Sequence, residues 1–202
     1  MKEFKHLPGL DLIRVFGILV VVFYHYQVET AVRGLCPADF LPAMEPLVQV
    51  AVYTMTLLSG SCLCWQEKSR SWSMKRYLWG RFLAIYPLFW LCFFPIFIYS
   101  DIICGNNESV APWKLLLSIV GVDGYFQSFT PTFYKIGEWY LGCILFLYAV
   151  FPVLWRMIRR RGVVFAAVGA LFAWLACCFV ENPGQLYSTL IGQLPLFFMG
   201  IF

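Results

Sequence analysis

The sequence predicts an all-α, polytopic transmembrane bundle of about six full or partial membrane helices plus the start of another. Composition is the first reason: the 202 residues are 61% hydrophobic and only 13% charged, whereas soluble domains carry about 25% charged residues. Apolar runs that approach the roughly 20 residues of a spanning helix are the second. The third is that basic residues gather in short stretches between these runs. Such a chain cannot cover its own surface with polar groups, so lipid is its natural solvent.

The apolar runs place the helices in order. We expect full membrane helices over Leu10–Val28, Pro46–Trp65, Phe82–Cys104, Phe133–Trp155 and Val163–Val180. A shorter segment, Trp113–Tyr125, contains Asp123 and Gly124, so we expect it to enter the membrane without crossing it. Ser188–Phe202 starts a further apolar segment and stops inside it. We therefore expect residues 1–202 to form one membrane domain, as the N-terminal part of a longer protein.

The orientation follows from the basic residues, because loops rich in Lys and Arg stay in the cytoplasm. Lys2 and Lys5 place the N-terminus inside, and the basic stretch from Lys68 to Arg81 then falls inside as well. The cluster Arg156–Arg161 falls inside only if Trp113–Tyr125 does not cross. If that segment spans the membrane, the cluster lies outside, against the rule.

Several classes of protein and site are disfavoured. Five Lys or Arg side chains lie between residues 68 and 81 and four between 156 and 161, whereas a nucleic-acid site would spread them over a polar surface, so we expect no nucleic-acid partner. Two histidines leave a metal few ligands, so we expect no metal. Six of the eight cysteines lie in apolar runs, where they act as small hydrophobes: Cys62, Cys64, Cys92, Cys143, Cys177 and Cys178.

Ionisable residues inside a membrane helix are costly and usually functional. The first predicted helix holds Asp11, Arg14 and His25. At about 100° per residue, Arg14 and His25 differ by three turns plus roughly 20°, so the three side chains share one stripe. His25 lies roughly 16 Å beyond Arg14 along the axis. The plainer interpretation makes Asp11 and Arg14 interfacial anchors and His25 a packed polar residue.

Glu138 opens the apolar helix expected from Phe133. The plainer interpretation is an acid favoured by the positive end of the helix dipole. If the helix enters from the outer side, Glu138 lies at a depth similar to that of His25, where a carboxylate would orient the imidazole and raise its basicity. If Trp113–Tyr125 spans instead, Glu138 moves to the inner side, nearer Arg14.

Lys75, Arg76 and Arg81 precede or begin the third predicted helix. The plainer interpretation is a loop that sets the orientation. The functional interpretation is a cytoplasmic phosphate-binding site, because arginine side chains bind phosphates with paired hydrogen-bond donors. The chain has no GxGxxG or Walker A loop, so these side chains would have to bind phosphate without one.

Four groups of residues now match one known family in order. Arg14 and His25, with ten residues between them, resemble the first-helix signature of the acyltransferase-3 family. Leu58-Ser59-Gly60 is similar to a segment of its second helix, although Met55 and Thr56 stand where phenylalanine is usual.

The other two groups lie further along the chain. Lys75, Arg76 and Arg81, followed by Ile85-Tyr86-Pro87, resemble the family's basic motif. The segment from Gly137-Glu138-Trp139 to Phe151-Pro152 resembles its Glu-Trp motif.

The resemblance implies a membrane enzyme, an O-acetyltransferase that passes acetyl groups from cytoplasmic acetyl-CoA to extracytoplasmic carbohydrate. His25 would be the catalytic histidine with Arg14 as its companion, and Glu138 would assist it. Lys75, Arg76 and Arg81 would hold the phosphorylated end of coenzyme A. The expected partners are membrane lipid, acetyl-CoA and a carbohydrate acceptor, in a bacterial inner membrane with the N-terminus in the cytoplasm.

Two mechanisms and two other functions stay open. His25 either acts as a general base on the acceptor hydroxyl or becomes transiently acylated. A transporter or channel would use the Arg, His and Glu side chains as an intramembrane relay, although the paired repeats of many transporters are not evident here. A third possibility is an inactive fragment or regulatory subunit.

Overall fold

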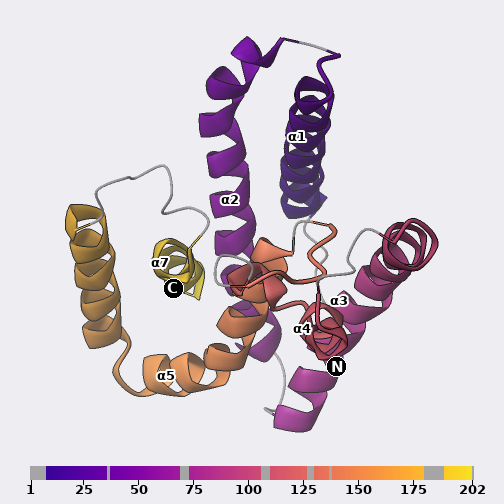
Figure 1. The fold of residues 1–202 in the computed structure, drawn as a ribbon. Coiled ribbons are helices and arrows are strands. Elements are labelled where there is room, and N and C mark those ends of the chain that lie inside the picture. Colours follow the sequence, from indigo (N-terminus) through magenta and orange to yellow (C-terminus); the bar gives the residue numbers. More distant parts are fainter. Residues whose placement is uncertain are drawn as a thin grey trace. The chain divides into compact units, whose positions relative to one another are not determined.

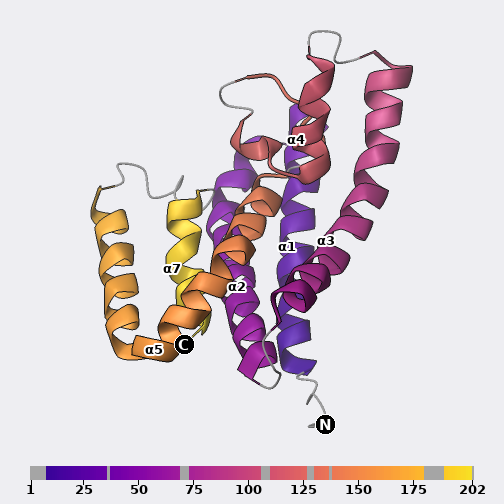
Figure 2. The same ribbon diagram turned by 90° about the horizontal axis from the view of Figure 1, so that it is seen from below.

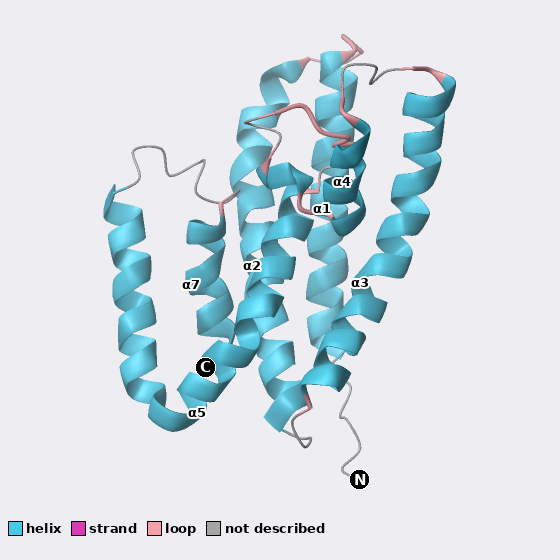
Figure 3. Cartoon of the chain, turned by 60° about the horizontal axis from the view of Figure 1, so that its bottom comes forward, coloured by secondary structure: helices cyan, strands magenta, loops and turns pink. Residues whose placement is uncertain are grey.

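The computed structural model describes residues 8–35, 37–68, 73–105, 110–126, 130–136, 138–179 and 189–201. Within these ranges the chain consists of helices and loops, without a strand, which confirms the all-α prediction (Figure 3). Four helical stretches are long and apolar enough to cross a bilayer: Pro8–Val32, Leu41–Gln66, Met74–Ile103 and Trp139–Arg160. The chain is therefore an integral membrane protein.

The helices fall into two compact units, and each is described by itself. The first comprises Met1–Arg70 and Met157–Phe202, and the second comprises Ser71–Arg156. The expectation of one domain over residues 1–202 stays a prediction.

In the first unit, α1 (Pro8–Val32) and α2 (Leu41–Lys68) lie side by side (Figures 1 and 2). The short 3-10 helix η1 (Ala38–Phe40) leads into α2. Gly17 is buried at the contact, where an added Cβ would meet the Met55 side chain at 3.5 Å. Large apolar side chains such as Phe16 and Leu19 are exposed elsewhere on α1, as expected of a helix face that contacts lipid.

The short helix α7 (Leu190–Ile201) packs closely on α2 (Figure 2). An added Cβ at Gly60 would overlap the backbone carbonyl of Phe197. Thr56 and Gln193 are fully buried, and the Thr56 hydroxyl donates to Gln193 Oε1 at 2.5 Å. Small residues at a close crossing and a hydrogen bond between helices are the usual means of helix association in membranes.

The second unit is built on α3 (Met74–Phe97), which continues as the π-helical turn η2 (Ile98–Ile103), and on the first part of α5 (Trp139–Phe179). Three short elements lie between them: η3 (Pro112–Lys114), α4 (Leu115–Val120) and η4 (Asp123–Tyr125). One buried hydrophobic cluster of this unit consists of Phe89, Phe93, Val110 and Phe133.

The α4 segment is too short to span. Its six residues cover about 9 Å, against about 30 Å of hydrocarbon, and it ends at Gly121 with a left-handed φ of 80°. Two hydrogen bonds hold its end to α3: Trp90 Nε1 donates to Ile119 O at 2.9 Å and the Tyr86 hydroxyl to Val120 O at 3.1 Å. The fold thus supports the prediction that Trp113–Tyr125 does not cross.

Two predicted boundaries were wrong. α3 begins at Met74 rather than at Phe82, so Lys75 and Arg76 are helical rather than in a loop. α5 is helical from Trp139 through Arg156–Arg161 to Phe179, so the expected gap between two helices is absent there, although the stretch that could span the membrane still ends at Arg160. The physical reason is the same in both places: Arg and Lys have high helix propensity, so a basic stretch marks a membrane boundary without ending a helix. Lys2, Lys5 and Arg70, on which the predicted orientation partly rests, lie outside the described residues.

Candidate active site

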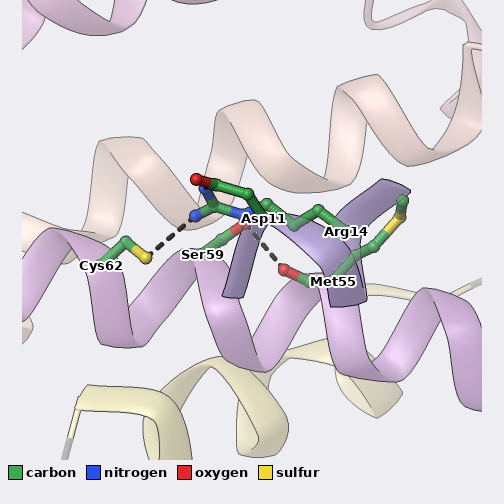
Figure 4. A network of polar contacts seen from close by, with 5 residues as sticks. All are labelled: Asp11, Arg14, Met55, Ser59 and Cys62. Carbon is green, nitrogen blue, oxygen red and sulfur yellow. Dashed lines mark hydrogen bonds and ion pairs between the residues drawn. The ribbon is translucent and has the colours of Figure 1, made fainter. Parts of the chain in front are cut away.

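Arg14 extends from α1 along the surface of α2 (Figure 4). Its Nη1 lies 3.4 Å from Asp11 Oδ1, one turn earlier, and its Nη2 donates to Cys62 Sγ at 2.9 Å. The Arg14 and Asp11 side chains are 38% and 46% exposed, so the ion pair contributes only about 0–1 kcal/mol. Its effect is geometric, because the carboxylate and the thiol together direct the guanidinium toward α2.

His25 lies on the same helix in a different environment. It is exposed, and its ring packs edge-on against that of Tyr24 with 5.9 Å between centroids. Arg14 contacts α2, and Gly17 and Val20, further along the helix, are buried. The expected common stripe therefore holds Arg14 against α2 and His25 on an exposed part of α1.

The basic residues of α3 divide into an exposed pair and an inner arginine. Lys75 and Arg76 are exposed on the first turn. Arg81 is half-buried, with its guanidinium carbon 5.5 Å from the centre of the Tyr148 ring. A cavity of about 150 Å³ opens there, lined by Tyr77, Leu78, Arg81, Phe82, Tyr86, Leu145, Tyr148 and Ala149. A cation thus lies in an aromatic cavity, with two further cations at the start of the same helix.

Tyr77 fixes the two walls of this cavity. Its hydroxyl donates to the backbone carbonyl of Tyr148 at 2.7 Å, and its ring stacks on Phe151 with 5.5 Å between centroids. Tyr77 belongs to α3 and its partners to α5, so the distance from Arg81 to Tyr148 is set by packing and not by a loop.

Glu138 is 2% exposed and immediately precedes α5. One oxygen, Oε1, accepts the backbone N–H of Lys135 at 3.3 Å. The side chain of Lys135 turns elsewhere: its Nζ lies 3.0 Å from Asp101 Oδ1 and donates to Ser100 Oγ at 3.2 Å. Burial, and then the nearby charge of Asp123, raise the pKa of the Glu138 carboxyl.

A close backbone contact brings Asp123 to Glu138. A Cβ added at Gly124 would lie 2.6 Å from the Cα and 2.8 Å from the N of Trp139. Only glycine allows η4 to approach the start of α5 in this way. Burial raises the pKa of Asp123, and the Ser118 hydroxyl and local backbone N–H groups offset part of that rise.

The comparisons with known proteins can now be set beside this geometry. A family model described as an acyltransferase domain matches residues 7–202. The chain belongs to the acyltransferase-3 family. It is also 27% identical over 201 residues to acyltransferase MdmB of Streptomyces mycarofaciens, covering 94% of this chain and 50% of that protein. The chain thus spans about half the length of this relative, and no solved structure matches it.

Within this acyltransferase-3 chain, the fold brings only some of the motif residues together. Arg81 joins an α5 residue, Tyr148, at the cavity, and Glu138 lies near Asp123 through the close approach of Gly124 to the start of α5. Arg14 and His25 belong to the first unit and Glu138 to the second. The predicted assistance of His25 by Glu138 therefore stays a prediction.

Sequence reasoning missed three residues of the acyltransferase-3 chain. Asp123 served only as evidence that its segment does not span, although an acid in an apolar stretch is itself a functional signal. Cys62 was taken as a small hydrophobe but accepts the Arg14 hydrogen bond. Tyr148 carries no local signal, because its contact with Arg81 joins positions far apart in sequence. Among the described residues, no group of three or more His, Cys, Asp or Glu is placed to hold a metal.

Proposed function

We propose that this chain is part of a membrane O-acetyltransferase that moves an acetyl or other short acyl group from acetyl-CoA to a carbohydrate hydroxyl. The acceptor belongs to a cell-surface polysaccharide or glycolipid, and the enzyme lies in a bacterial inner membrane with its N-terminus in the cytoplasm. Family membership supports acyl transfer, and the residues of the cavity on α3 support the donor.

The single observation that supports acetyl-CoA as the donor is the position of Arg81 in its aromatic cavity. Lys75 and Arg76 are exposed at the start of the same helix. Coenzyme A is a polyanion with a flat base and a thin arm. Arginine binds phosphate with paired donors, and the N-terminal end of a helix favours anions. Aromatic walls suit the less polar parts of the molecule.

His25 is the proposed catalytic residue. As general base, its imidazole takes the proton of the acceptor hydroxyl while the oxygen attacks the thioester carbonyl. The new C–O bond forms, the C–S bond breaks, and the proton passes to the departing sulfur of coenzyme A. In the other mechanism His25 first carries the acyl group itself, and the hydroxyl then attacks that intermediate.

Arg14 and Glu138 have supporting roles. The guanidinium of Arg14, directed by Asp11 and Cys62, joins α1 to α2 and so positions the helix that carries His25, from which it is separated by about 16 Å along the axis. Glu138 supplies a carboxylate that orients the imidazole and favours its charged form.

The test uses membranes that contain the protein, radiolabelled acetyl-CoA and analysis of the glycans that gain label. His25→Ala should abolish transfer while the protein still inserts. The matched control is Tyr26→Phe, at the next residue, which is likewise exposed and should transfer label at the unaltered rate. Normal transfer in His25→Ala rejects the assignment. Substrate-dependent proton flux into liposomes, without consumption of acetyl-CoA, would instead identify a transporter.

A further inference from the structure

Two acidic residues are buried together in the second unit. Asp123 in η4 is 0% exposed, and Glu138 at the start of α5 is 2% exposed. The two residues are brought near each other because the backbone of Gly124 lies directly on that of Glu138 and Trp139. A second close contact supports the first: a Cβ at Gly142 would lie 2.9 Å from the Tyr125 ring and 3.3 Å from Gly121 O. The segments that carry the two acids are thus held close together at Gly124 and at Gly142.

Several carboxylate oxygens of this pair lack hydrogen-bond partners within the part of the chain that the structure describes. Both carboxylate oxygens of Asp123 and the Oε2 of Glu138 complete no hydrogen bond among the described residues. Ser118, which is fully buried and lies against Asp123, likewise completes none: it is close enough to affect the carboxyl, but its geometry falls short of a hydrogen bond. An independent buried hydroxyl therefore also faces the pair with its hydrogen-bonding capacity unused.

The groups around the pair do not neutralise it. The nearby cation, Lys135, directs its Nζ to Asp101 and offers only its backbone N–H to Glu138. Tyr134 lies close enough to both acids for their charges to raise the pKa of its phenol, beyond the rise caused by burial. The Ser118 hydroxyl and the Tyr134 phenol thus lie near the pair, and neither supplies a positive charge.

We propose that Asp123 and Glu138 share one proton at neutral pH, and that this proton fastens η4 to the start of α5. Two adjacent carboxylates cannot both stay ionised away from water without a cation. A carboxyl O–H donated to a carboxylate makes a short, strong hydrogen bond and leaves one negative charge on the pair. Because the two groups are coupled, the proton belongs to the pair and not to either residue. The shared proton does not depend on the proposed acyl-transfer activity.

Infrared difference spectroscopy of the purified protein tests this directly, since a protonated carboxyl has its own C=O band. We expect that band at neutral pH, and expect it to disappear in Asp123→Asn and in Glu138→Gln. In each variant an amide N–H replaces the carboxyl O–H as donor, so the remaining acid ionises. Asp39→Asn alters an exposed acid and should leave the band unchanged.

A second measurement follows the fastening of η4. Raising the pH removes the shared proton, so hydrogen exchange over residues 121–126, corrected for its intrinsic rate, should accelerate in the unaltered protein. In the two amide variants this acceleration should be absent, and their protection at neutral pH shows that they remain folded. The proposal is overturned if the unaltered protein lacks the band at neutral pH, or if the band persists in either amide variant. If the pair were ionised and bound a divalent cation instead, the band would be missing at neutral pH and the proposal would be overturned.

Discussion

The guanidinium of Arg14 on α1 donates a hydrogen bond to the thiol of Cys62 on α2, across 2.9 Å. The two residues are 48 positions apart in the sequence. Ser59, one turn before Cys62, turns its own hydroxyl to the backbone carbonyl of Met55 at 2.8 Å (Figure 4). The thiol is therefore the partner that α2 offers to Arg14 at this point, and it sets where the positive charge is held.

Replacing Arg14 tests whether that position matters for acyl transfer. Arg14→Lys keeps a charge but has neither the planar fork nor the reach to hold Asp11 and Cys62 together. We expect transfer to fall by about tenfold or more, as for the loss of one charge-assisted hydrogen bond. Cys62→Ala, which leaves the guanidinium in place, should have a smaller effect in the same labelling assay. Equal activity of Arg14→Lys and the unaltered protein would contradict the proposed role.

Arg81 should act on donor binding more than on chemistry. Arg81→Ala removes the cation from the aromatic cavity, so we expect a higher KM for acetyl-CoA with a smaller change in kcat. Tyr148→Phe keeps the ring beneath the guanidinium and is the matched control, with KM close to the unaltered value. Steady-state kinetics at two salt concentrations provide the check, because added salt should weaken the contribution of the exposed Lys75 and Arg76. A decrease confined to kcat would contradict a role of Arg81 in binding the donor.

Gly124 should tolerate no side chain. A Cβ would press on the backbone of Trp139, and such overpacking costs about 1–3 kcal/mol. We expect Gly124→Ala to lower Tm and to accelerate hydrogen exchange in η4. Gly80 on α3 has nothing within 4 Å of an added Cβ, so Gly80→Ala should be neutral or stabilising, by up to about 1 kcal/mol of helix propensity. Equal Tm values for the two variants would refute the close contact.

The crossing of α2 and α7 gives a parallel expectation. Gly200→Ala would place a methyl group on the backbone carbonyl of Leu57, and the buried pair Thr56 and Gln193 would lose its alignment. We expect lower Tm in detergent and faster proteolysis near α7. Gly9→Ala, with open space around the added Cβ, is the control. Unchanged proteolysis in Gly200→Ala would show that the two helices need not approach so closely.

Stability should fall as the pH rises, because of the buried acids. The pKa of Glu138 is raised above its ordinary value of 4.5 in the folded protein, and that of Asp123 above 3.8. The protonated carboxyls therefore favour the folded state, fully at pH values below the ordinary ones, and that contribution is lost as the pH rises through the folded values. We therefore expect Tm to fall as the pH rises above these ordinary values. Glu138→Gln should show a flatter slope, and an equal slope in both proteins would contradict the expectation.

The sequence by itself determined the class of the protein and most of its helices. Apolar length and charge placement are local properties, so they located α1, α2, the main part of α3 and the membrane part of α5, and they showed that Trp113–Tyr125 was too short to cross. The order of the motifs, from Arg14 and His25 to Glu138, also indicated the family. Local signals were weakest at the ends of helices, because Lys and Arg both mark a membrane boundary and favour helix.

The tertiary structure alone decided which polar groups meet. Asp123 lies near Glu138 because Gly124 permits two backbones to touch, and Arg14 reaches Cys62 because α1 lies along α2. Arg81 lies over Tyr148 because Tyr77 joins α3 to α5. Each of these contacts depends on packing between segments distant in sequence. The hydrophobic periodicity and composition of one segment do not determine the free energy of its packing against another.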